Sequence, residues 1–418
     1  MAETPSPYAP GIISNEPART RPAGRALVFL AAAFMMVLAG ATTDWHFWMK
    51  ELATKTGVSP TSPLVVVTIS VPGVLVLLWA YLSDRVPLFG ARREGYLLVA
   101  GLVGAAAWGA LGFGAAHATV WVTAPVLIAA AMAVSRAAID GGLTEIGRRH
   151  ATTGVMAASY VMVSDLADLG GVAQDVLSER AFGWTAGVGA VLWLTIVLLV
   201  ATLGFADDDA APTVPASELP AGIPRFLRSR TFWAAVAVAV CAGFASLPRP
   251  IIDAYFHVRG RETTMSLWVW GHVIPVAAAG IYLLACRRLR FAALLRLALA
   301  LKALALVAFW LLLGAGPNDT IVALIAPTAG DALANVALID LAMRAAPRGR
   351  EAFGFVLLSG LPHLITGTLG SVTGMMMDMI HVPVSTVALF CAGAAVVGVA
   401  AVSLLPRAVS SASGDDGR

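Results

Sequence analysis

Residues 81–97 read YLSDRVPLFGARREGYL and form the first dense group of charged residues after two long apolar runs. Another apolar run follows at once, so this group fills a loop that is too short to be a domain. Pro87 and Gly90 disfavour a continuous helix through the stretch. We therefore predict a helix that ends near Asp84, a tight charged loop, and a new helix that begins near Arg93.

The composition indicates that lipid is the main solvent of this chain. Apolar residues make up 58% of the 418 positions and charged residues only 13%, and the mean hydropathy is +0.81. Soluble proteins carry about 25% charged residues, and a helix needs roughly 20 apolar residues to cross a bilayer. Twelve such runs predict an all-α membrane protein with twelve transmembrane helices. The expected spans are 26–44, 62–82, 95–116, 119–139, 154–176, 185–206, 231–252, 264–286, 291–314, 319–341, 352–377 and 383–405.

The twelve runs divide into two halves of six at the break over 207–230, which contains four prolines and mixed charge. Traces of a repeat support this division. Asp140 is followed by Arg148 and Gly154, and the same residue types recur at a constant offset of 200 in the second half. We expect a disordered tail over 1–24, a six-helix bundle over 25–206, a cytoplasmic linker over 207–230, a second bundle over 231–405 and a tail over 406–418.

The distribution of positive charge predicts the topology. Of the 28 Lys and Arg residues, the expected spans place 20 on the side of both termini, 6 on the other side and 2 within helices. Lys and Arg are enriched in cytoplasmic loops. We therefore expect an integral protein of the inner (cytoplasmic) membrane with both termini in the cytoplasm.

The opening stretch resembles the loop between helices 2 and 3 of the major facilitator superfamily. Its form S-D-x-x-P-L-F-G-x-R-R-x-x-Y-L is similar to that of the folate–biopterin transporter branch. Residues 50–60 (KELATKTGVSP) and 345–360 (AAPRGREAFGFVLLSG) are similar to further parts of this branch. The resemblance implies two pseudo-symmetric halves around a central cavity, and a solute such as a folate or pterin that is commonly carried with protons.

Charged residues at the expected cytoplasmic ends of the helices are candidates for a gate. We expect Asp84 to cap or salt-bridge the foot of the fourth helix, where Arg136 and Arg148 are available, and so to latch an outward-open state. The alternative is simple anchoring by the positive-inside rule. The candidate gate residues are Asp84, Arg85, Arg92, Arg93, Arg136, Asp140 and Arg148.

The span expected over 154–176 is rich in acidic residues. Asp165 and Asp168 are three apart and share one face of the helix. His272, in the span over 264–286, lies at a matching depth, and the resemblance to the superfamily implies that these two spans face each other. We therefore expect His272 to pair with Asp168. An ionisable group at the bilayer centre costs about 2.5–3.5 kcal/mol or more, and groups that are kept there despite this cost commonly mark functional sites. This favours a role for these three residues in proton coupling. The alternatives are an interhelical hydrogen-bonded seam for the aspartates and a packing role for the histidine.

Five polar residues are candidates for solute binding because they lie on helices that face the cavity in the superfamily: Asp44, Asp253, Tyr255, Asp331 and Asn335. The first three lie near the outer ends of the first and seventh helices, where they could receive a flat heteroaromatic ring. An interfacial aromatic belt with capping acids is the alternative. Lys302 is the natural counter-charge of Asp331, and a purely structural pair is the alternative there.

The sequence argues against an enzyme and against an ATP-driven pump. It contains no G-x-x-x-x-G-K-[ST] loop, no soluble domain large enough for a nucleotide, and no Cys/His cluster with zinc-ligand spacing. We expect no cofactor, metal or nucleic acid. The prediction is a monomeric secondary transporter that moves a small organic solute by alternating access with protons, as a symporter. The alternatives are an exporter of amphipathic compounds and a non-transporting delivery or assembly factor for a pigment or lipid.

Overall fold

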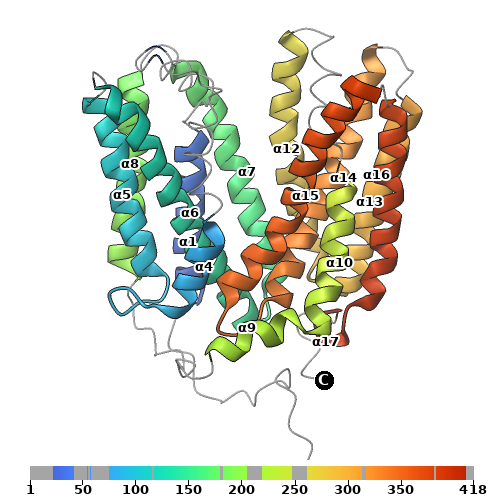
Figure 1. The fold of residues 1–418 in the computed structure, drawn as a ribbon, viewed down its shortest axis with the longest axis horizontal. Helices are drawn as coiled ribbons and strands as arrows, with labels where there is room; N and C mark the ends of the chain where they lie inside the picture. Colours follow the sequence, from blue (N-terminus) through green and yellow to red (C-terminus); the bar gives the residue numbers. More distant parts are fainter. Residues whose placement is uncertain are drawn as a thin grey trace, which may run out of the picture.

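The computed structural model describes residues 22–41, 54, 57, 75–114, 117–178, 182–204, 219–246, 261–312, 317–380 and 383–410. These residues are helical almost throughout, and the helices form two bundles that stand side by side (Figure 1). Each of the twelve predicted spans coincides, wholly or in part, with a helix in these ranges. Most of the second span, up to residue 74, lies outside the described residues.

The first bundle contains α1 (Pro22–Ala41), α4 (Val76–Arg85), α5 (Glu94–Phe113), α6 (Ala118–Arg149), α7 (Thr153–Ser178) and α8 (Phe182–Leu199), and a π-helical turn over Val200–Gly204 follows α8. The second bundle contains α10 (Arg230–Phe244), α12 (Arg261–Ala285), α13 (Phe291–Leu312), α14 (Pro317–Ala345), α15 (Glu351–Ile380) and α16 (Val384–Ala401), and a 3₁₀ turn over Val402–Leu404 follows α16.

Two short helices lie outside the two bundles, one in the expected linker and one in a tail that we expected to be disordered. Helix α9 (Leu219–Leu227) lies within the linker, and α17 (Arg407–Ser410) lies within the C-terminal tail. Each has an apolar side chain that packs on the bundle, Phe226 in α9 and Val409 in α17, and this packing explains why the segments are ordered. The remaining tail residues, 1–21 and 411–418, lie outside the described residues.

The helices have the lengths and surfaces that a bilayer requires. Among the described residues, seven helices are long and apolar enough to cross a membrane, and shorter apolar helical segments occur at 230–244, 270–285 and 351–366. Large apolar side chains such as Leu198, Leu304 and Val396 are exposed on the outside of the bundles. In water such a surface would be unfavourable, whereas in lipid it is the expected exterior.

Contacts between the bundles come from a limited set of helices. In the second bundle, α12 and α14 pack on α7, and α15 packs on α4 and α6. Four of these helices contain an internal proline: Pro125 in α6, Pro275 in α12, Pro327 in α14 and Pro362 in α15. Proline removes a helical hydrogen bond and permits bending. Four of the six helices at the interface between the halves therefore carry a potential bending point.

Candidate functional site

The loop between α4 and α5 forms as the sequence predicts. Helix α4 ends at Arg85, one residue after Asp84, and α5 begins at Glu94, one residue after Arg93. Between them the backbones of Leu88 and Ala91 exchange two hydrogen bonds of 2.9 and 3.0 Å around Gly90, whose φ is +79°. Such a φ favours glycine. The tight turn brings the two charged ends of the loop together.

Asp84 and Arg93 form a fully buried ion pair. The guanidinium Nη2 donates to Asp84 Oδ1 at 2.8 Å, and both side chains are inaccessible to solvent. Two further carboxylates face the same guanidinium, Glu145 of α6 at 3.6 Å and Glu351 of α15 at 3.5 Å. Burial alone would lower the pKa of Arg93, but Asp84, Glu145 and Glu351 outweigh it and raise the pKa above its usual value. Arg93 therefore stays charged at any ordinary pH.

Asp84 also caps a helix of the opposite half. Its Oδ2 accepts a hydrogen bond from the backbone N–H of Phe353 at 2.9 Å, and its Oδ1 accepts one from Ala352 at 3.3 Å. These N–H groups belong to the first turn of α15, where a negative charge is stabilised. The expectation that Asp84 would pair with Arg136 or Arg148 at the foot of the fourth helix is wrong, because Arg93 and the start of α15 occupy its carboxylate.

Two more arginines of the first half reach backbone carbonyls of the second. Arg92 donates to Gly349 at 3.3 Å and also to the carbonyl of Asp84 at 3.0 Å, and Arg148 donates to Ala346. Arg85 lies over the ring of Tyr81, 4.6 Å from its centroid. We call the contacts that Asp84, Arg92, Arg93 and Arg148 make with residues 346–353 the latch. The latch joins the halves at the end of the bundle that carries the loops 86–93 and 346–350, which we call the arginine-rich end.

Arg136 and Asp140 lie inside α6 and take no part in the latch. The Arg136 Nε is 3.7 Å from Asp140 Oδ2, one helical turn away. The two side chains differ in environment, since that of Asp140 is buried and that of Arg136 is 51% exposed. The structure therefore separates these two residues from the other gate candidates.

The equivalent position of the second half, Asp340 in α14, forms a different buried network. Its carboxylate accepts hydrogen bonds of 2.8 Å from Tyr282 of α12 and from Arg344, one turn further along α14. The same carboxylate lies close to the start of α7, where a Cβ on Gly154 would come within 3.1 Å of Asp340 Oδ2. Two members of the sequence repeat, Asp340 of the second copy and Gly154 of the first, thus lie close together at a contact between the halves.

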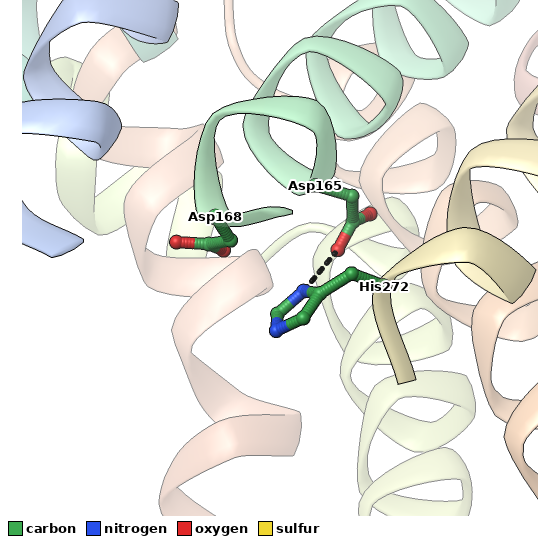
Figure 2. Close-up of side chains that lie close together, drawn as sticks. All are labelled: Asp165, Asp168 and His272. Carbon is green, nitrogen blue, oxygen red and sulfur yellow. Dashed lines mark ion pairs between the residues drawn. The ribbon is translucent and has the colours of Figure 1, made fainter. Parts of the chain in front are cut away.

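Asp165, Asp168 and His272 meet between the two halves (Figure 2). Asp165 and Asp168 project from α7 of the first half, and His272 projects from α12 of the second. The histidine Nδ1 is 3.8 Å from Asp165 Oδ1, and all three side chains are half-buried. We expected His272 to pair with Asp168, but the ion pair joins it to Asp165. We call these three residues the acidic–histidine cluster.

The acidic–histidine cluster has the composition of a cation site. Each residue offers one ligand atom, and in the described part of the chain these three atoms lie within 4.8 Å of one another. Two carboxylates and an imidazole could accept protons, and together they are also a donor set that divalent cations use. Because the donors come from both halves, occupancy by a cation would change how strongly α7 and α12 are held together.

Asp331 and Lys302 form a second intramembrane charge pair, as the sequence suggested. The Lys302 Nζ of α13 is 2.6 Å from Asp331 Oδ1 of α14. The helices approach closely because Gly330 has no side chain, and a Cβ there would come within 2.8 Å of the Lys302 Cα. Asn335, one turn beyond Asp331, is half-buried.

Three candidate substrate-binding residues, Asp44, Asp253 and Tyr255, lie outside the described residues. Their proposed role in receiving an aromatic ring stays a prediction.

Sequence reasoning missed Glu145 and Glu351, the two carboxylates that share the Arg93 guanidinium. A signal for Glu351 was present, because it follows Arg350 directly in a stretch that resembles the transporter branch. Glu145 carries no such signal, since one glutamate four residues before Arg149 is typical of an exposed helical ion pair. That pair also forms, at 3.2 Å.

Comparisons with known proteins agree with the fold. A sequence model of the BT1 family matches residues 42–283. Among solved structures, the transporter FucP in the outward conformation has a TM-score of 0.69 at 13% identity, over 90% of this chain and 97% of its own. FucP is the fucose:proton symporter of E. coli. A bacterial homologue of the iron transporter ferroportin, in an outward-facing state, scores 0.65 at 14% identity, over 90% and 98%.

The proton:xylose symporter XylE bound to 6-bromo-6-deoxy-D-glucose also scores 0.65, at 12% identity, over 91% of this chain and 94% of its own. No curated protein sequence matches this chain significantly. The structural likenesses all concern major facilitator proteins, and at these identities they establish the fold alone.

Proposed function

The chain belongs to the BT1 family of membrane transporters, and on this premise we propose that it carries a small folate- or pterin-like solute by proton-coupled alternating access. The observation that supports this proposal most strongly is the acidic–histidine cluster. It places two carboxylates and an imidazole within 4.8 Å of one another across the interface between the halves. Ionisable side chains inside a membrane protein are costly and commonly mark ion pathways.

The acidic–histidine cluster suggests how proton binding is linked to the movement of the two halves relative to each other. With His272 protonated and Asp165 charged, the two side chains attract each other across α7 and α12. Loss of the proton removes that attraction and leaves two carboxylates close together. The free energy of contact between the halves then depends on the bound proton, which is the condition for coupling a gradient to a conformational change.

The latch supplies the second element of an alternating-access cycle. Its contacts join Asp84 and Arg93 of the first half to the start of α15 in the second. We assign the arginine-rich end to the cytoplasm, in the inner membrane, because of the bias in positive charge. The latch then favours a state that is closed on the cytoplasmic side, and it must break when the solute is released there.

Uptake of solute by proteoliposomes tests the proposed function. Purified protein is reconstituted, a pH gradient is imposed, and accumulation of folate and of biopterin is followed with labelled compounds. We expect accumulation of at least one of them above the level reached without a gradient. Liposomes that contain the denatured protein control for leakage.

Each other result would withdraw a part of the proposal. Equilibration without accumulation would leave a facilitator and remove proton coupling. Uptake of neither compound by folded protein would remove the folate–pterin class. In that case, binding of amphipathic compounds would favour an exporter, and stable co-purification with a pigment- or lipid-binding complex would favour a delivery factor.

A further inference from the structure

Lys302 is a cation buried in the middle of a membrane helix. It is the twelfth of the 22 residues of α13, and its side chain is 3% exposed. On the opposite face of α13, Leu297 and Leu304 are exposed, as expected of side chains that face lipid. Lys302 therefore points inward, toward the other helices of its half. A charged group at this depth is costly unless it is paired or reaches water.

Three oxygen atoms surround the ammonium group. They are Asp331 Oδ1 of α14 at 2.6 Å, Ser246 Oγ at 2.9 Å and the carbonyl oxygen of Ala242 in α10 at 3.2 Å. The ammonium group donates hydrogen bonds to Ser246 and Ala242, and it forms an ion pair with Asp331. Only Asp331 carries a negative charge, so the neutral acceptors position the ammonium while Asp331 neutralises it.

The two members of the pair differ sharply in exposure. The Asp331 side chain is 37% exposed, against 3% for Lys302. From Ile325 to Ala345 no residue of α14 is exposed as a whole, and α14 packs on α10, α12, α13 and α15 of its own half and on α6 and α7 of the other. Since this part of α14 has no face turned to lipid, the open side of Asp331 faces the interior of the protein between these helices.

We infer that Lys302 is an anion-binding residue for a carboxylate of the transported solute, and that Asp331 occupies this place in the empty transporter. The inference rests on the proposed transport function and narrows its solute to an anionic one. Asp331 stands between the ammonium and the open interior, as a bound solute carboxylate would. When a solute carboxylate takes this position, it gains a charge-assisted hydrogen bond from a donor that Ser246 and Ala242 hold in place.

A small anion distinguishes an anion-binding site at Lys302 from a purely structural pair of Lys302 and Asp331. In Asp331→Ala the ammonium loses its counter-charge, and the space vacated by the carboxylate is about the size of formate. Formate should therefore stabilise this variant if the site is open to the interior. We expect the melting temperature of purified Asp331→Ala to rise by about 2 °C in sodium formate relative to sodium gluconate at equal ionic strength. Gluconate is too large for the vacancy.

Two controls make this measurement specific. In Asp340→Ala the lost carboxylate is also paired with a cation, but Asp340 is completely buried, so formate should not stabilise this variant. The double variant Lys302→Gln/Asp331→Ala lacks the cation and should not respond either. Equal melting temperatures of Asp331→Ala in formate and gluconate, or an equal response of the double variant, would overturn the inference.

A second measurement links the site to transport. Folate carries carboxylates and biopterin does not, so Lys302→Gln should lower the ratio of folate to biopterin uptake roughly tenfold or more. A merely structural lysine would lower both uptakes together and leave their ratio unchanged, which would also overturn the inference. Formate stabilisation without uptake of either compound by the wild type would uphold the anion site and reject the proposed solute class.

Discussion

Replacement of Asp84 by Asn should open the arginine-rich end of the transporter. The ion pair between Asp84 and Arg93 lies within the first half and can persist in every state. The hydrogen bonds from Ala352 and Phe353 to Asp84 cross between the halves and exist only while this end is closed. Asparagine has nearly the same shape, but it lacks the charge that the first turn of α15 stabilises.

The size of the effect follows from these two cross-half hydrogen bonds. Hydrogen bonds to a charged group contribute about 1.5–3 kcal/mol and neutral ones about 0.5–1.5 kcal/mol, while a charge at a helix N-terminus adds roughly 0.3–1 kcal/mol. The bond from Phe353 is short at 2.9 Å, and the bond from Ala352 is long at 3.3 Å and contributes less. We expect a loss of about 2 kcal/mol, which changes the ratio of closed to open molecules roughly 30-fold.

Distances between spin labels would measure this ratio directly. His150 at the end of α6 and Arg288 after α12 are exposed and lie on different halves, so each can be replaced by cysteine and labelled. The native cysteines are replaced first: Cys241, Cys286 and Cys391. In liposomes, the wild type should show one dominant short distance, and Asp84→Asn should add a longer one.

Glu94→Gln is the matched control. Glu94 is buried and pairs with Arg25 at 2.7 Å, but both residues belong to the first half. Its replacement removes a buried negative charge of the same loop without touching a contact between halves, so the distance distribution should stay that of the wild type. If Asp84→Asn gave the wild-type distribution, or if both variants shifted equally, the reasoning about the latch would be refuted.

Two further predictions concern buried packing and hydrogen bonding. Gly141→Ala should destabilise the closed state, because a Cβ there would overlap the guanidinium of Arg93; the same spin-label pair should report a longer distance, and an unchanged distribution would contradict this. Tyr282→Phe removes the 2.8 Å hydrogen bond to Asp340 and should cost about 1–3 kcal/mol because the buried carboxylate loses a donor; a fall in the thermal unfolding temperature in detergent would show it, and an unchanged temperature would contradict it.

The helical architecture could be predicted from the sequence because lipid imposes a simple rule. Long apolar runs have to be helices, and the charged loop 86–93 interrupts them with a proline and a glycine. The lengths of the runs also gave the depths of residues on α7 and α12, and the resemblance to the superfamily implied that these helices face each other. Depth does not fix rotation about a helix axis, and His272 consequently pairs with Asp165 where Asp168 was expected.

The partners of Asp84 could not be predicted from residue types. Its acceptor oxygens receive backbone N–H groups of Ala352 and Phe353, and such donors are the same for every residue at the start of a helix. A sequence does show arginines that could pair with a carboxylate, and for this reason Arg136 and Arg148 were the expected partners of Asp84. Lys302 presents a similar case. Its inward direction depends on the packing of α13 against α14 and α16, which the apolar pattern of a membrane helix does not reveal.

The central claim is that the acidic–histidine cluster couples protons to solute movement, and proton flow driven by solute tests it most directly. Proteoliposomes are loaded with a pH-sensitive dye at equal pH on both sides, and the solute that supports uptake is added outside. The account predicts acidification of the interior by the wild type. In Asp168→Asn, acidification should be lost while exchange of labelled for unlabelled solute continues. Acidification by the variant at the wild-type rate would contradict the account.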